Sequence, residues 1–117
     1  MYKRQAISPE EKAYTLSRIV SESVRSDLNI SKTYLNILKE LKESSNIPIV
    51  TIRYYSAQGV MAYSEEMSLD STLYWYDLAI NTMKSSNVND VKLQVALHNN
   101  KAIAYACLLY TSPSPRD

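Results

Sequence analysis

Apolar residues recur three or four positions apart along most of this 117-residue chain. That spacing buries one face of an α-helix, and short polar segments separate five such stretches. Glycine, which strand-and-turn folds need at their turns, occurs only once, as Gly59. The pattern therefore predicts an all-α chain of five antiparallel helices, each of roughly 16 to 18 residues. Clear stripes are Ala13, Leu16, Val20 and Val24; Ile30, Tyr34, Ile37, Leu38 and Leu41; and Leu69, Leu73, Tyr76, Ile80 and Met83.

Capping residues predict where each helix begins. Ser8 is a good N-cap, Pro9 suits the first helical position, and Glu11 completes a capping box. The remaining helices are expected to start at Asn29, Pro48, either Ser68 or Asp70, and Asn89. The segments "ESSN" (43–46) and "KSSN" (84–87) are expected to end the second and fourth helices.

The chain also resembles itself at a nearly constant offset. Residues 34–46 align with 75–87 and residues 14–20 with 55–61 at a shift of 41, and residues 54–63 align with 96–105 at a shift of 42. Any two amphipathic helices match to some degree, but here the turn residues "SSN" match as well. This regularity predicts that the first, third and fifth helices are copies of one element and the second and fourth copies of another.

Several residues of the middle repeat resemble the tetratricopeptide repeat (TPR) family, which has an aromatic, Leu-Gly and Tyr on its first helix and Ala and an aromatic on its second. Tyr55, Gly59, Tyr63, Tyr76 and Ala79 lie at or next to those positions. The resemblance implies an α-solenoid of antiparallel helix-hairpin repeats, about two and a half in number.

This chain departs from the family in its longer period and at three positions. Gln58 replaces Leu, Thr72 replaces Ala, and Lys101 stands where a third repeat would have glycine. HEAT-like helical repeats are the alternative.

The two ends of the chain resemble translated sequencing-adapter DNA. With GTG as a start codon read as Met, "MYKRQ" can be encoded by GTG TAT AAG AGA CAG. The reverse complement of this string reappears at the other end, from a C permitted as the last base of Ala106 into codons permitted for "CLLYT". A natural Ser/Pro-rich tail would explain the composition "CLLYTSPSPRD" but not the matching ends. We therefore expect residues 1–5 and 107–117 to be adapter-derived, the latter as a disordered tail. Residues 6–106 would then be a TPR-like fragment of a longer protein.

Composition and motifs argue against several functions. The net charge of +1 gives no field for nucleic acid, and no apolar run approaches the roughly 20 residues that span a bilayer. His98 is the only histidine, residues 6–106 contain no cysteine, and no phosphate-binding or zinc motif occurs. We expect no enzyme activity, cofactor or metal. The aromatic residues Tyr54, Tyr55, Tyr74, Trp75 and Tyr76 are interpreted as core between repeats.

The TPR resemblance implies that the first helix of each repeat lines a groove for a peptide or protein partner. The candidate groove residues are Arg53, Ser56, Val60, Tyr63, His98, Ala102 and Tyr105, with Thr15, Ile19 and Glu22 on the first helix. The role expected is an interaction module in a larger, cytoplasmic signalling or regulatory protein. The alternative is a structural spacer or effector-sensing domain of a transcriptional regulator or sensor kinase. Self-association is expected through the fifth helix, at Ala96, Leu97, Ile103 and Tyr105.

Overall fold

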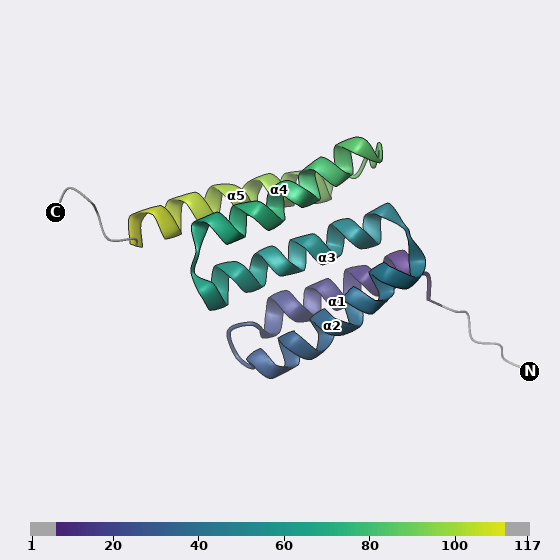
Figure 1. Cartoon of the computed structure of the whole chain (residues 1–117), viewed down its shortest axis with the longest axis horizontal. Coiled ribbons are helices and arrows are strands. Elements are labelled where there is room, and N and C mark those ends of the chain that lie inside the picture. Colours follow the sequence, from purple (N-terminus) through teal and green to yellow (C-terminus); the bar gives the residue numbers. More distant parts are fainter. Residues whose placement is uncertain (1–6, 112–117) are drawn as a thin grey trace, which may run out of the picture.

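All regular secondary structure in the described part of the chain is helical, as expected. The computed structural model describes the backbone of residues 7–111 and the side chains of residues 7–109. Its helices are α1 (Pro9–Ser23), α2 (Leu28–Ser45), α3 (Pro48–Met61), α4 (Leu69–Ser85) and α5 (Val91–Thr111), with a π-helical turn at Ala62–Glu66. Consecutive helices reverse direction, so each is antiparallel to the one before it (Figure 1).

Three of the five predicted helix starts are confirmed. Ser8 and Glu11 form the expected capping box, in which the Glu11 amide donates to Ser8 Oγ at 3.2 Å and the Ser8 amide to Glu11 Oε1 at 3.4 Å. Pro48 begins α3, and Ser68, rather than Asp70, caps α4 by accepting a hydrogen bond from the Ser71 amide. These starts depend on contacts within one helical turn, which explains why the local sequence predicts them.

The predicted caps Asn29 and Asn89 are wrong by one or two residues. Asp27 caps α2 instead, because its carboxylate accepts hydrogen bonds from the backbone amides of Asn29 and Ile30. Asp90 does the same for α5, accepting from the Leu93 amide at 3.0 Å. A carboxylate also complements the positive end of the helix dipole, so in each case the aspartate caps the helix in place of the nearby asparagine.

The asparagine of each "SSN" segment adopts a positive φ just after its helix. Asn46 follows α2 with φ 55°, and Asn87 follows α4 with φ 56°. Both lie in the left-handed region, which asparagine tolerates better than most residues with a side chain. The two residues are 41 positions apart, which is the shift found in the sequence.

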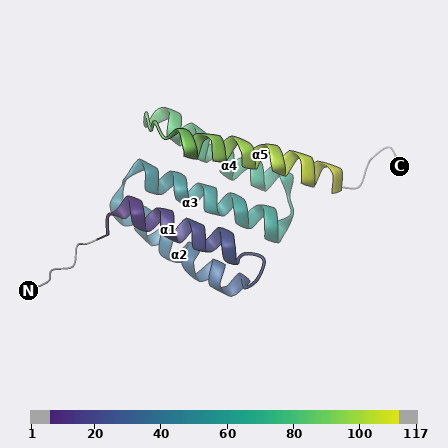
Figure 2. The ribbon, with the colours of Figure 1, turned by 180° about the vertical axis from the view of Figure 1, so that it is seen from behind.

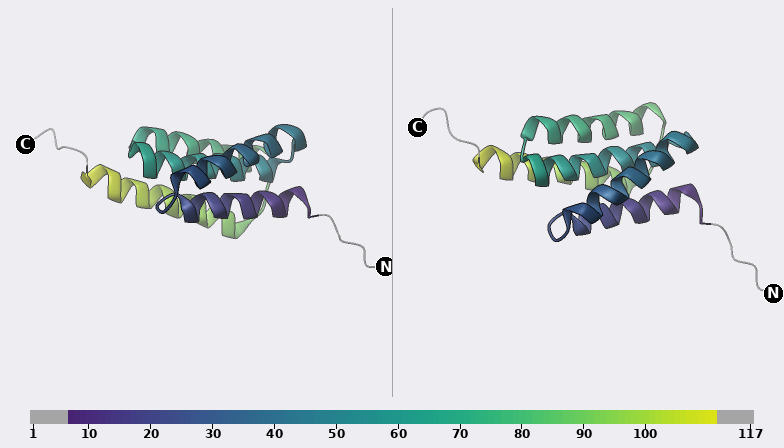
Figure 3. Two further views of the ribbon diagram at one scale, coloured as in Figure 1. Left: turned by 90° about the horizontal axis from the view of Figure 1, so that it is seen from below. Right: turned by 60° about the horizontal axis from the view of Figure 1, so that its bottom comes forward.

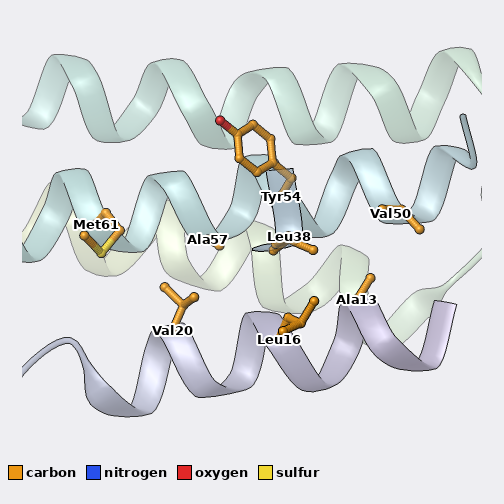
Figure 4. Packing of buried hydrophobic residues seen from close by; sticks show 8 residues of the cluster. All are labelled: Ala13, Leu16, Val20, Leu38, Val50, Tyr54, Ala57 and Met61. Carbon is orange, nitrogen blue, oxygen red and sulfur yellow. The ribbon is translucent and has the colours of Figure 1, made fainter. Parts of the chain in front are cut away.

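Helix α3 lies at the centre of the fold and contributes to two hydrophobic clusters. Val50, Tyr54, Ala57 and Met61 pack against Ala13, Leu16 and Val20 of α1 and Leu38 of α2 (Figure 4). Ile52 points into a second cluster with Tyr76, Ala79, Ile80 and Met83 of α4 and Leu93 and Leu97 of α5. Because α3 is buried on more than one face, it lacks the single apolar stripe of a surface helix.

The odd-numbered helices share one side of the molecule. Seen from behind, α1 and α5 lie nearest the viewer on either side of α3 (Figure 2). Seen from below, α1 and α5 lie along the same edge (Figure 3, left). Gly59 of α3 is buried directly against the ring of Tyr76 on α4. Helix α3 thus lies between α1 and α5 on this side of the molecule.

Helix α5 continues beyond the end expected for it at residue 106. The structure keeps residues 107–111 helical, and Leu108 is buried with 4% of its surface exposed. The expected disorder of the tail therefore does not hold for this part of it. Leu108 follows Leu93, Leu97 and Ala104 at helical spacing, so burial of one apolar stripe accounts for the continuation. The adapter-like residues 1–5 and 112–117 lie outside the described residues.

Candidate functional site

One continuous groove runs along α1, α3 and α5. It consists of three adjoining hollows: Ser21 and Glu22 line both the first and the second, and Arg25 and Tyr63 both the second and the third. We call them the Arg53 end, the middle section and the Cys107 end. The last two have volumes of about 430 and 480 Å³ and are open to solvent. The groove is therefore an elongated surface and not an enclosed cavity.

The Arg53 end combines charge with small polar side chains. The Arg53 guanidinium lies over the ring of Tyr14, 4.9 Å from its centroid, and Arg18 lies over the same ring at 5.9 Å. Half-burial removes water from Arg53 and lowers its pKa, and the nearby Asp90 opposes this effect. The hollow is lined by Tyr14, Ser17, Arg18, Ser21, Glu22, Arg53, Ser56, Leu93 and Ala96.

The middle section combines apolar and polar side chains. Its lining includes Val60 of α3 and Ile103 of α5, with Tyr76 and Asn100 between them. Tyr76 is 3% exposed, and burial raises the pKa of its hydroxyl to about 12, although a hydrogen bond with Asn100 acts in the opposite direction. Tyr76 therefore stays neutral at physiological pH and reaches the groove as a hydrogen-bonding group.

The Cys107 end is built by the π-helical turn and the last turns of α5. Tyr63 and Ser64 belong to the π-helical turn and face Cys107 and Leu108 of α5. A hydrogen bond with the Cys107 thiol raises the pKa of the Tyr63 hydroxyl. The Glu65 side chain does not line the groove; it forms an ion pair with Lys32 of α2 at 3.0 Å. π-helical turns often occur at functional sites, where they change the direction of side chains.

The structure brings together only part of the predicted groove. Arg53 and Ser56 lie at the Arg53 end, Val60 in the middle section, and Tyr63 in both the middle section and the Cys107 end. Glu22 of α1 also lines it, whereas Thr15 lies in a separate hollow beside Ile7 and Glu10.

The α5 residues predicted for the groove lie elsewhere. His98 lines a different hollow near the α4–α5 turn, together with Met83 and Val88. Ala102 and Tyr105 are exposed and contribute nothing to the lining of the groove. Instead α5 presents Leu93, Ala96, Asn100, Ile103 and Cys107.

The groove-lining face of α5 follows from which leucines are buried. Leu93 and Leu97 pack against α3 and α4, and Leu97 is fully buried, which sets the rotation of the helix. The sequence alignment placed residue 98 opposite Ser56, whereas the structure places Ala96 beside it. Apolar residues surround α5, so the spacing of Leu93, Leu97, Ala104 and Leu108 does not by itself identify the buried face or the groove-lining stripe next to it.

The chemical groups of the described residues do not form a metal centre. Among residues 7–109, no three His, Cys, Asp or Glu side chains lie close enough together to hold a metal ion. His98, the only imidazole, is exposed. Within the helices between residues 9 and 111, none has both the length and the apolar character required to cross a bilayer.

Comparison with known proteins adds no relative. A scan against protein-family models, a search of curated proteins and a search of solved structures all find no match to this chain.

Proposed function

We propose that this chain is a TPR-like α-solenoid module and that its groove binds a peptide or a protein partner. The observation that supports the proposal is the continuous groove along three alternate helices. Its lining includes Arg53, Ser56, Val60 and Tyr63 of α3 and the π-helical turn, four of the seven residues expected from the repeat pattern. Alternate helices that line one open surface are the usual layout for peptide binding by helical repeats.

Two further observations support a repeat array. Asn46 and Asn87, 41 residues apart, end α2 and α4 in the same left-handed conformation. Gly59 permits close approach of α3 and α4, which is the role that the TPR resemblance implies for a small residue there. The period of 41 to 42 also fits HEAT-like repeats, which span about 40 to 47 residues, so the HEAT-like array is the alternative subclass.

The groove suits an elongated ligand more than a small molecule. Small-molecule sites are mostly enclosed and bury the greater part of the ligand. Here the lining mixes charged and hydroxyl groups, such as Arg53 and Ser56, with apolar side chains, such as Val60 and Ile103. Such a mixed lining can contact successive side chains of one peptide. We assign the module to a larger signalling or regulatory protein, with a spacer or effector-sensing domain as the alternative role.

Selection from a random 12-residue peptide library, displayed as N-terminal fusions, tests this function. Affinities of selected peptides are then measured for the wild type, for Val60→Glu inside the groove, and for Ile37→Glu on the exposed side of α2. We expect Val60→Glu to weaken binding at least about 10-fold and Ile37→Glu to leave it unchanged. The proposal fails if the library yields no binder, or if both variants bind like the wild type.

A further inference from the structure

The Arg53 end holds two positive charges against one aromatic ring. The guanidinium groups of Arg18 and Arg53 both lie over Tyr14, at 5.9 and 4.9 Å from the ring centroid. Cation–π contacts hold such groups in place without neutralising their charge. The ring therefore positions two cations on the same wall of the groove.

Only one of the two cations has a carboxylate partner. Glu22 binds Arg18 at 2.6 Å, on the same helix. Arg53 forms no ion pair among the described residues, and the nearest carboxylate that influences it, Asp90, instead caps α5. One unneutralised positive charge thus remains at this end of the groove.

Arg53 also has a buried donor without a partner. Its Nε is buried and forms no hydrogen bond within residues 7–109. Leaving a buried donor without a partner costs about 1–3 kcal/mol, more when the group is charged. The hydroxyls of Ser21 and Ser56 line the same hollow and likewise have no partner among the described side chains.

We infer that the Arg53 end binds the side-chain carboxylate of an Asp or Glu within the partner peptide. The Arg53 guanidinium supplies the charge and a planar fork of donors, Ser21 and Ser56 supply neutral donors beside it, and Tyr14 holds the guanidinium in place. Glu22 lines the same hollow, and its ion pair with Arg18 offsets its negative charge there. This inference rests on the proposed function, because it names the chemical group of the peptide that the groove binds.

The first test needs no change to the protein. In the selection described above the peptides are fusions without a free C-terminus, so any acid they carry is a side chain. We expect the selected peptides to share one Asp or Glu, and synthetic amidated versions with Glu→Gln to bind about 10- to 100-fold more weakly. Binders that share no acid, or whose Glu→Gln versions bind equally well, overturn the inference and leave the proposed function standing. A library without binders overturns both.

The second test assigns the carboxylate to Arg53. Arg53→Met keeps most of the side-chain volume and removes the charge, and Lys39→Met makes the same change of charge on the exposed surface of α2. We expect Arg53→Met to bind the Glu and Gln peptides with equal affinity and Lys39→Met to keep the wild-type preference. Arg53→Lys restores the charge without the fork and should recover part of the preference. If Arg53→Met, shown to be folded by circular dichroism, still prefers the Glu peptide, the carboxylate binds elsewhere and the inference is wrong.

Discussion

The ring of Tyr76 occupies the space that a side chain at position 59 would need. A Cβ atom built on Gly59 would lie 2.7 Å from Tyr76 Cε1 and 2.8 Å from Cζ, well inside van der Waals contact. Tyr76 is 3% exposed and belongs to the cluster that joins α3, α4 and α5, so its ring cannot move aside freely. The absence of a side chain at Gly59 is therefore what lets α3 and α4 approach each other.

Gly59→Ala tests this relationship because two effects act in opposite directions. Helix propensity favours alanine by about 1 kcal/mol, whereas overpacking a core costs about 1–3 kcal/mol. We expect a net loss of about 1 kcal/mol in the free energy of unfolding, measured with urea, and a larger loss for Gly59→Leu. Asn36→Ala, at an exposed position of α2, is the control and should not destabilise. A more stable Gly59→Ala would show that the contact with Tyr76 is not restrictive.

The raised pKa of the Tyr76 hydroxyl predicts how the stability of the fold changes at alkaline pH. Burial raises its pKa to about 12 in the folded state, whereas an unfolded tyrosine has a pKa of about 10. As the pH rises, the unfolded chain therefore loses this proton before the folded protein does. The contribution of Tyr76 to the free energy of unfolding is complete below pH 10 and is lost as the pH rises towards 12. The loss is about 3 kcal/mol at most.

The chain contains ten tyrosines, so the contribution of Tyr76 is measured as a difference between two proteins. Urea unfolding of the wild type and of Tyr76→Phe is compared between pH 8 and 11, within the range in which both still fold. We expect the stability of the wild type to fall more steeply than that of Tyr76→Phe. Parallel curves would mean that the folded protein does not hold the Tyr76 proton more tightly than the unfolded chain does.

Leu108 and Leu109 are neighbours in α5 with opposite environments. Leu108 is 4% exposed and Leu109 is 57% exposed. We expect Leu108→Ala to lower the free energy of unfolding by about 1–3 kcal/mol, because it removes buried methyl groups near the end of a helix. Leu109→Ala should change it by less than about 0.5 kcal/mol. If both substitutions had equal, negligible effects, residues 107–111 would instead belong to the disordered tail expected from the sequence.

The exposed side of α5 is expected to mediate self-association. Leu97, expected to take part, is fully buried, and Ala96 lines the groove. The large apolar side chains that α5 exposes within residues 91–109 are Val91, Val95, Ile103, Tyr105 and Leu109. We expect sedimentation of the wild type to show concentration-dependent association and Val95→Glu to weaken it at least about 10-fold. Glu substituted for Ile37 on α2 is the matched control, and a wild type that stays monomeric at high concentration would contradict the expectation.

Helix positions could be predicted from the sequence because their signals are local. Ser8 with Glu11, Pro48 and Ser68 begin helices through contacts within one turn, and Asn46 and Asn87 end them in a conformation that suits asparagine. These features require no knowledge of how the helices are arranged in space.

The tertiary structure decided which face of each helix lines the groove. Helix α5 is the clearest case, because apolar residues occur around its whole circumference and its periodicity alone does not select a buried face. Packing of Leu93 and Leu97 against α3 and α4 sets its rotation, which brings Asn100 and Ile103 into the groove and leaves His98, Ala102 and Tyr105 outside it. The joint contact of Arg18 and Arg53 with Tyr14 depends on the packing of α1 against α3, so no local pattern could have predicted it.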